Sequence, residues 1–470
     1  MLGKSPIAIV AGVAAAFAVM LYALQYGLSY KELIVVFGTL TGVVIVLGRE
    51  RGIRFGFVLW IATLALGYRT IGITTDFRIH PGQVVLLLLF VCILPQRKLT
   101  ERARFSLPLW LWLLMPFFVF GWWPLVVGDA RWDAMLNEFI NFLLIVPLIV
   151  VAAVVLEHEN YWRVLLLVFF VASTWIAALG LLEYLFPEVV KLFPAFMNST
   201  RIDSTPEGFV RAKFAFWGGP EATFICVIAL PIAIALAGWW KTRWHQAMII
   251  LASIAQVVAI YIAGYRSIWM LLCVEVLVGL LLGVKRRNFA IAILSLVVIA
   301  GGYQFIPKLA AERAISGMRA IQGNPVDSSA LVRQQRALAT VSATVDEPLG
   351  SGWASSGWVH SDFIQVAANL GIIAGIIFLG GYLYTLVRLG RRALAMSRRN
   401  DDGKMGLALF LSFIGVGGLL AMEGVEVLPQ MILPVWFVWA LVEIWLWQTF
   451  ERASQYVHRD LEFAVGSRNA

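Results

Sequence analysis

Runs of apolar residues long enough to cross a lipid bilayer recur along almost the whole chain. A membrane-spanning helix needs about 20 mostly apolar residues to cross roughly 30 Å of hydrocarbon. Fourteen runs meet or approach this length: 7–28, 32–48, 53–73, 82–96, 107–128, 136–156, 162–186, 219–239, 245–264, 267–284, 288–305, 361–387, 405–424 and 430–449. The sequence therefore predicts an all-α polytopic membrane protein with about 14 transmembrane helices, within a range of about 12–14.

Charged residues are too scarce for a soluble protein. Apolar residues make up 60% of the 470 residues and charged residues 14%, whereas charged residues reach about 25% in soluble domains. A net charge of +9 also occurs in nucleic-acid-binding proteins, but in a membrane protein it reflects basic cytoplasmic loops. No soluble stretch is long enough for a nucleic-acid-binding domain, so we expect no nucleic-acid partner.

The cysteines give no sign of a metal site or a disulfide framework. Cys92, Cys226 and Cys273 all lie inside apolar runs and lack metal-type spacing. We expect them to be packing residues. The Asp, Glu and His residues of the outer loops are also too scattered for a metal cluster, so the sequence predicts neither a metal nor a cofactor.

Basic residues between the predicted spans indicate which loops are cytoplasmic, because cytoplasmic loops are enriched in Lys and Arg. With both termini placed in the cytoplasm, five basic clusters fall on the cytoplasmic side: Arg49, Arg51 and Arg54; Arg97, Lys98, Arg102 and Arg104; Lys241 and Arg243; Lys285, Arg286 and Arg287; and Arg388, Arg391, Arg392, Arg398, Arg399 and Lys404. The two long loops 187–218 and 306–360 then lie on the outer side.

These two outer loops and their neighbours are themselves cationic. Ten basic residues lie in or beside them: Lys191, Arg201, Arg211, Lys213, Arg266, Lys308, Arg313, Arg319, Arg333 and Arg336. Clustered positive charge on the outer side opposes the topological bias and indicates an anion-binding site. The alternative is that long loops cross the membrane whatever their charge.

The segment HSDFIQVAANLGIIAG places His360 and Asp362 at the outer end of the twelfth predicted span. A helix N-terminus carries partial positive charge, which disfavours the imidazolium form. A neutral His360 can act as a general base, and an interfacial histidine without chemistry is the alternative. Asp362 is a second candidate for the base or for binding a sugar hydroxyl, unless Ser361 or Asp362 merely caps the helix.

An outer helix is predicted just upstream, in DSSALVRQQRALATVSATV. Helical spacing of about 100° per residue puts Leu331, Leu338 and Val345 on one face and Arg333 and Arg336 on the opposite face. Two guanidinium groups one turn apart match the oxygens of a phosphate, and the alternative is a solvated polar face. The proline and glycines of EPLGSGW then end the helix and lead back toward the twelfth span.

Arg266 lies in YIAGYRSIWMLL, in a gap between two predicted spans that is too short for a free loop. A permanent charge between two spans is costly unless it faces a polar cavity or an anion, and snorkelling to the outer interface is the alternative. In FVRAKFAFWGGPEATF, Arg211 and Lys213 add positive charge before a Gly-Gly-Pro entry to the eighth span, where Glu221 follows. Both segments place cations at helix starts on the outer side.

In this order, the segments resemble the bacterial O-antigen ligase and O-antigen polymerase superfamily. The resemblance covers roughly residues 200–385 and joins RAKFAFWGGPEA, GYRSIW, the arginine helix with its EPLGSGW turn, and HSDFIQVAANLGIIAG. Each piece alone is short, whereas their order and shared side of the membrane are more specific. The resemblance implies a GT-C-like helical fold and a metal-independent, inverting glycosyltransferase at the periplasmic face of the bacterial inner membrane.

The family also implies substrates and partners. The donor would be a glycan on undecaprenyl pyrophosphate. The acceptor would be a lipid A core sugar for a ligase or a lipid-linked repeat for a polymerase. Membrane lipids and, for chain extension, a chain-length regulator are further partners. Fourteen spans favour the polymerase, because ligases of the family commonly have fewer.

Family roles carry over to individual positions. Arg211, Arg266 and Arg333 match basic residues thought to hold the pyrophosphate, and His360 matches the family's essential histidine. Arg336 is added from helical geometry alone. The family usually has Asn where this chain has Ser361 and Glu221, so the contacts to the acceptor are not carried over.

The expected organisation has three parts: N-terminal transmembrane helices (1–190), a catalytic region that includes both outer loops (191–390), and C-terminal transmembrane helices with a cytoplasmic tail (391–470). A lipid-linked glycan flippase or secondary transporter is the alternative function. Such a protein would carry ionisable groups near the middle of the bilayer. The predicted spans have few, and Glu275 is the main exception.

Overall fold

The computed structural model describes most of the helical part of the chain. The described residues are Gly38, Gly42, 52–64, 71–72, 78–94, 107–127, 132–157, 159–186, 203–204, 210–211, 220–282, 328–354, 359–396, 401–422 and 429–466. They form helices, apart from two antiparallel pairs of two-residue strands, β1 (Ile71–Gly72) with β2 (Arg78–Ile79) and β3 (Asp203–Ser204) with β4 (Val210–Arg211). The fold is therefore helical, as predicted.

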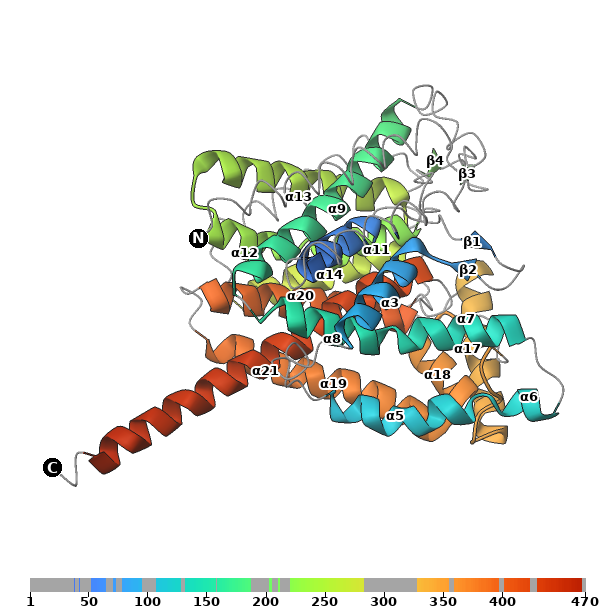
Figure 1. Ribbon diagram of the computed structural model, residues 1–470. Helices are drawn as coiled ribbons and strands as arrows, with labels where there is room; N and C mark the ends of the chain where they lie inside the picture. The colour runs from blue at the N-terminus through green and yellow to red at the C-terminus, as the bar shows by residue number, and fades with distance from the viewer. Residues whose placement is uncertain are drawn as a thin grey trace.

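The helices occupy most of the predicted apolar runs (Figure 1). Besides an apolar helix at Gly52–Thr63, they are α3 (Pro81–Ile93), α5 (Leu109–Phe120), α6 (Trp123–Val127), α7 (Trp132–Leu143), α8 (Ile145–Val155), α9 (Glu159–Leu185), α11 (Pro220–Ala229), α12 (Ile232–Trp239), α13 (Arg243–Ala263), α14 (Arg266–Leu281), α17 (Ser328–Asp346), α18 (Asp362–Leu370), α19 (Ile372–Ala395), α20 (Asp401–Met422) and α21 (Pro429–Gly466).

Six helices of the described part are long and apolar enough to cross a membrane: Trp132–Val155, Asn160–Leu185, Arg243–Ala263, Ile372–Ala395, Asp401–Met422 and Met431–Phe450. A seventh span is formed if the bent pair Ala222–Ala229 and Ile232–Trp239 counts as one. The chain is thus a multi-pass membrane protein. Two of the fourteen predicted spans, 7–28 and 288–305, lie outside the described residues, and of 32–48 only Gly38 and Gly42 are described.

Several predicted spans are not continuous helices. The run 107–128 is divided between α5 and α6, and the helix in the run 53–73 ends at Thr63, before strand β1. The run 219–239 bends by 47° between α11 and α12, where Pro231 lacks the backbone N–H that a continuous helix needs. The run 361–387 is divided at Gly371, whose φ of 98° is incompatible with a right-handed helix. The expectation of one helix through 361–387 is therefore wrong: α18 is a separate helix, and the long span starts at Ile372.

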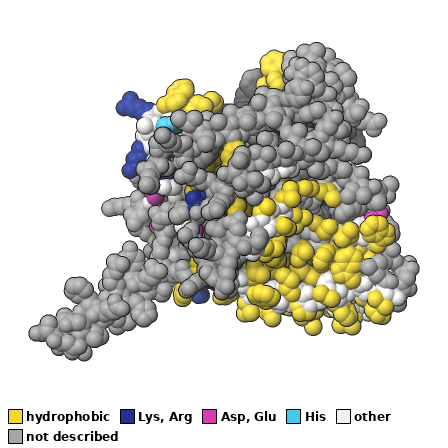
Figure 2. All heavy atoms as spheres, in the orientation of Figure 1, with side chains coloured by type: hydrophobic (Ala, Val, Ile, Leu, Met, Phe, Trp, Pro, Cys, Tyr) yellow, Lys and Arg dark blue, Asp and Glu magenta, His cyan; other side chains and the backbone are white. Residues whose placement is uncertain are grey.

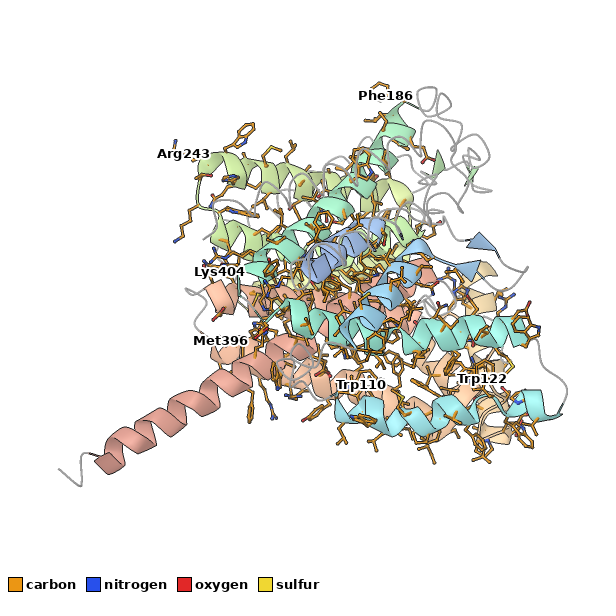
Figure 3. The ribbon with its side chains drawn as sticks, in the orientation of Figure 1. Trp110, Trp122, Phe186, Arg243, Met396 and Lys404 are labelled. Carbon is orange, nitrogen blue, oxygen red and sulfur yellow. The ribbon has the colours of Figure 1, made fainter. Side chains whose placement is uncertain are left out.

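Basic residues that were predicted to share one side of the membrane gather at one end of the helices. Arg163 on α9 lies 3.5 Å from Asp401 on α20, and the Arg392 guanidinium donates to the backbone oxygen of Thr449 at 2.7 Å. In Figure 3, Arg243 and Lys404 lie at this end, and Trp122 and Phe186 lie toward the opposite end. We call the first the basic end; which side of the membrane it faces stays a prediction.

Aromatic side chains fill the centre of the bundle, where α5, α19, α20 and α21 meet. The ring of Trp439 lies 4.7 Å from that of Trp110, 5.7 Å from Phe378 and 5.4 Å from Phe413, measured between ring centroids. Large rings in offset or edge-on contact bury much apolar area and fix the helix positions. Helix α5 from the first third of the chain and α19, α20 and α21 from its C-terminal part thus share one core.

Apolar side chains also cover much of the outside. Leu109, Trp112 and Val119 on α5 and Ile373 and Ile376 on α19 are all more than half exposed. Figure 2 shows hydrophobic side chains spread over the face where α5 and α19 lie. Exposed apolar patches of this extent mark contact with lipid or with another protein, and the apolar spans favour lipid.

Glycines allow close packing of α20 against its neighbours, and this gives a stability prediction. A methyl group at Gly417 would collide with the ring and hydroxyl of Tyr382, whose hydroxyl donates to the backbone oxygen of Phe413 at 3.2 Å. We expect Gly417→Ala to lower the free energy of unfolding by about 1–3 kcal/mol through overpacking.

The matched control is Gly380→Ala on α19, because no atom lies within 4 Å of a Cβ at that position. This change is expected to be neutral or to stabilise by up to about 1 kcal/mol through helix propensity. Thermal unfolding of both variants in detergent measures the difference. Equal melting temperatures would contradict the packing described for α20.

Candidate functional site

A loop between α17 and α18 is bound to the C-terminal end of α18. The last carbonyl groups of a helix have no partner within that helix. Backbone N–H groups of the 348–354 loop supply partners at this end, and Ile372 binds back to the loop. The three bonds are Ser351 N to Ala368 O at 2.9 Å, Gly352 N to Asn369 O at 2.8 Å, and Ile372 N to Pro348 O at 3.0 Å.

Glycine is required where this loop and the helix end meet. Gly350, Gly352 and Gly371 have φ angles of 86°, 90° and 98°, a region that other residues rarely adopt. A Cβ at Gly350 would lie 2.6 Å from the backbone oxygen of Asn369, and one at Gly371 would lie 2.8 Å from that of Leu349. The two backbones therefore touch directly.

Trp353 anchors the loop to α5 and α7. Its backbone N–H donates to Gly121 O at 3.0 Å, and its indole N–H donates to Phe118 O at 3.1 Å. The ring packs 5.8 to 5.9 Å from Phe118, Phe139 and Phe142. An indole that is both buried and hydrogen-bonded holds one orientation, so this end of the loop is rigid.

One carboxylate oxygen of Glu138 on α7 binds both the 348–354 loop and α18. Its Oε2 accepts from the backbone N–H of Ala354 at 2.7 Å and from the side-chain amide of Asn369 at 2.9 Å. Ala354 has φ 58°, the one positive value among the described residues other than glycine. A strained backbone conformation of this kind persists only where neighbouring groups hold it in place. Here the hydrogen bond from Ala354 to the Glu138 carboxylate does so.

His360 lies just before α18, and the residues on either side of it in the chain hold its position. The backbone N–H of Val359 donates to the side-chain oxygen of Gln365 at 2.8 Å, and Gln365 is fully buried. Ser361 is the N-cap residue, although its side chain makes no capping bond, and Asp362 is the first residue of α18. The Asp362 side chain is fully buried and has interactions within the fold, and it is not the N-cap residue.

The arginine helix lies within electrostatic reach of His360. Burial and, as smaller causes, the charges of Arg333 and Arg336 together lower the pKa of His360 from 6.5 to about 4. His360 is therefore neutral at physiological pH. Between about pH 4 and 6.5 the unfolded chain binds a proton here that the folded chain does not, so folding stability falls as the pH drops through this window.

Helix α17 (Ser328–Asp346) agrees with the helix predicted in residues 327–345. Its arginines differ in exposure. Arg333 is half-buried and Arg336 is exposed, so Arg333 is the more enclosed guanidinium. The structure therefore brings together three of the eight predicted site residues, His360, Arg333 and Arg336. Asp362 starts α18 two residues after His360.

The other predicted site residues are described less fully. Arg211 is in β4, paired with Asp203, Arg266 is the first residue of α14, and Glu221 is the second residue of α11; only their backbones are described. Lys213 lies outside the described residues. Among the described residues, no three His, Cys, Asp or Glu side chains are grouped to hold a metal ion.

Sequence reasoning missed the residues that position the loop. Gln365 and Asn369 stand out only as isolated polar residues in an apolar run, and Glu138 lies in the segment DAMLNEFINF, far away in the chain. A buried carboxylate or amide within a predicted span signals a hydrogen-bonded partner. The sequence does not reveal which partner that is.

Comparisons with known proteins do not extend this picture. No protein-family model matches the chain, and no curated protein matches it. The resemblance stated above therefore rests on the order of its motifs in the sequence.

Replacing Glu138 tests whether it holds the loop. Glu138→Ala leaves two donors without their acceptor, and each such buried group costs about 1–3 kcal/mol. We expect amide hydrogen exchange in residues 351–354 to accelerate at least about tenfold, since about 1.4 kcal/mol corresponds to a factor of ten. Mass-spectrometric exchange on the purified protein in detergent measures this.

Glu443→Ala is the matched control. Glu443 is also a buried carboxylate that accepts from two side chains, Thr385 at 2.7 Å and Trp110 at 3.3 Å. Its removal should leave exchange in the 348–354 loop unchanged. The role of Glu138 is refuted if both variants accelerate exchange of the loop equally, or if neither does.

Proposed function

We propose that this chain is a glycosyltransferase of the bacterial inner membrane. It moves a glycan from undecaprenyl pyrophosphate to a sugar hydroxyl at the periplasmic face. The observation that carries the proposal is the neutral, half-buried His360 within electrostatic reach of Arg333 and Arg336, beside a rigid loop. A base beside an anion clamp suits transfer from a phosphate-activated donor.

The residues have distinct roles in this reaction. The arginines bind the pyrophosphate and stabilise the negative charge that grows on it as the bond between the anomeric carbon and the phosphate oxygen breaks. His360 takes the proton of the acceptor hydroxyl, whose oxygen forms the new bond from the opposite face of the sugar. A single displacement inverts the anomeric configuration, and the pyrophosphate leaves as the lipid-linked product.

Binding of the anionic donor changes the pKa of the general base, His360. A base with a pKa near 4 is weak, because proton transfer is most efficient when the pKa lies near the working pH. An anion between Arg333 and Arg336 offsets their field at His360. The pKa of His360 then rises once the donor is bound, so the base is strengthened when it is needed.

The proposal also includes the number of membrane spans and the side of the membrane on which the termini and the site lie. A GT-C-like arrangement with about 14 spans, cytoplasmic termini and a periplasmic site is consistent with the basic end lying opposite to Trp122 and Phe186. Either acceptor branch suits the site. A lipid A core acceptor would make the protein an O-antigen ligase, and a lipid-linked repeat would make it a polymerase of surface polysaccharide.

A lipid-linked glycan flippase or secondary transporter is the second candidate, and Glu275 is the observation that favours it. Its side chain is 3% exposed within the apolar helix α14. Neither carboxylate oxygen has a hydrogen-bond partner in the part of the chain that the structure describes. Ionisable groups inside membrane helices often bind protons or ions in transporters.

A transfer assay distinguishes the two functions. Purified protein in liposomes is given a defined lipid-pyrophosphate-linked oligosaccharide, with a lipid A acceptor or a second lipid-linked repeat. We expect transfer by the wild type with or without EDTA, and at least a hundredfold loss in His360→Ala, since one positioned base contributes about 10²–10⁴-fold. A similar loss is expected in Arg266→Ala, since one group that stabilises the developing charge contributes about 10²–10³-fold. His245→Ala, an exposed histidine at the basic end, is the control that keeps activity.

The products separate the branches. A ladder of lengthening lipid-linked chains identifies a polymerase, and a single shift of the lipid A acceptor identifies a ligase. If well-folded protein transfers to neither acceptor, or if the variants match the wild type, the glycosyltransferase proposal fails and transport replaces it.

The pH dependence tests the coupling between anion and base. The profile of kcat/KM reports the free enzyme and that of kcat reports the donor complex. We expect the acidic limb of kcat/KM near pH 4 and the acidic limb of kcat at a higher pH, because the bound anion raises the pKa of His360. Coincident limbs, or a limb of kcat/KM near 6.5, would contradict the coupling.

A further inference from the structure

The arginine helix α17 carries an exposed apolar stripe. Leu338, Val341 and Val345 lie three and four residues apart on one side of the helix, and Leu349 follows in the turn after it. Their exposed fractions are 62%, 45%, 65% and 67%. Spacing of this kind places all three helical residues on one face, so the stripe is continuous.

The opposite arrangement would be expected for a helix packed on a protein in water. There, apolar residues face the core and polar residues face solvent. On α17 the most enclosed residue is polar: Thr344 is 7% exposed, and its hydroxyl donates to Thr340 O at 2.7 Å. Arg333, Ala337 and Thr340 on the same side are half-buried. The side of α17 that faces the protein thus carries no large apolar residue, and Leu338, Val341 and Val345 face outward.

The stripe continues into the lipid-facing surface of a membrane span. Ile372, the first residue of α19, donates its backbone N–H to Pro348 O at 3.0 Å, and the backbone of Gly371 approaches that of Leu349. Ile373 and Ile376, one and four residues into that span, are 57% and 65% exposed. Exposed Leu349 therefore adjoins the exposed start of α19.

Figure 1 draws α17 across the direction of α5 and α7 rather than along it. A helix that lies along the membrane surface runs in this way, with its apolar face in the acyl region and its basic residues on the polar side. α17 has both kinds of face: the stripe is apolar, and Arg333 and Arg336 lie on another side of the helix.

We infer that the stripe of Leu338, Val341, Val345 and Leu349 is immersed in the bilayer leaflet at this end of the protein, where its partner is the acyl chains of lipids. α17 is then an interfacial helix. Its arginines are held at the depth of the lipid phosphates, toward which long basic side chains reach. The inference rests on the multi-pass membrane fold and does not depend on the proposed glycosyl transfer.

Spin labels on the full chain in liposomes test the inference. Leu338→Cys, Val341→Cys and Val345→Cys are labelled singly with a nitroxide, in a chain whose Cys92, Cys226 and Cys273 are replaced by Ala. Ala339→Cys and Ala343→Cys are the matched controls, because both positions are exposed on another side of the same helix. Collision rates are measured with oxygen, which concentrates in the bilayer, and with a water-soluble nickel chelate.

We expect the ratio of oxygen to nickel collisions to be at least threefold higher at the stripe than at the two control positions. Nickel access at the stripe equal to that at the controls would place the stripe in water and overturn the inference. Exclusion of both reagents would mean that another protein surface covers the stripe, which also overturns it.

A second measurement needs no substitution. Photolysis of a lipid-soluble diazirine in liposomes of the wild-type chain should label the peptide that contains Leu338–Leu349, as it labels the peptide of Ile373 and Ile376. Labelling of the α19 peptide without the α17 peptide would contradict the inference even if the cysteine-free chain misfolds.

Discussion

The bonds between the 348–354 loop and the end of α18 are the constraint on which the rest of the site depends. A helix that stops among apolar surroundings leaves carbonyl groups unpaired, and each would be costly there. Ser351 and Gly352 supply the missing donors, so the chain can break at Gly371 and still be satisfied. This break makes α18 a short separate helix with His360 just before it, and it fixes the residue at which α19 begins.

The basic residues occupy two different kinds of position in this fold. One end of the bundle carries Arg163 and Arg392, which bind to neighbouring helices, and Lys404, which pairs with Asp401 on its own helix. The arginines of α17 are positioned differently: Arg333 is half-buried against the protein, and Arg336 is exposed on the same helix. The consequence for His360 is a neutral imidazole beside permanent cations, which is an arrangement suited to receive an anion and a proton in turn.

The sequence predicted the helical membrane fold and the helix of Ser328–Asp346 correctly, because both follow from the length and spacing of apolar residues. It also placed a turn after that helix from its proline and glycines. The sequence did not predict the helix break at Gly371, because a single glycine in an apolar run does not indicate a positive φ. It also missed Glu138, because its two hydrogen bonds join residues more than 200 positions away in the chain.

The central claim is that Arg333, Arg336 and His360 face one space that binds a pyrophosphate. Diethyl pyrocarbonate modifies neutral imidazole, so its rate at His360, followed by mass spectrometry, reports access to this space. Polyprenyl pyrophosphate should slow the modification of His360 severalfold without affecting His245, and the protection should disappear in the double variant Arg333→Gln and Arg336→Gln. An unchanged rate at His360 with saturating lipid, or equal protection in the double variant, would contradict the account.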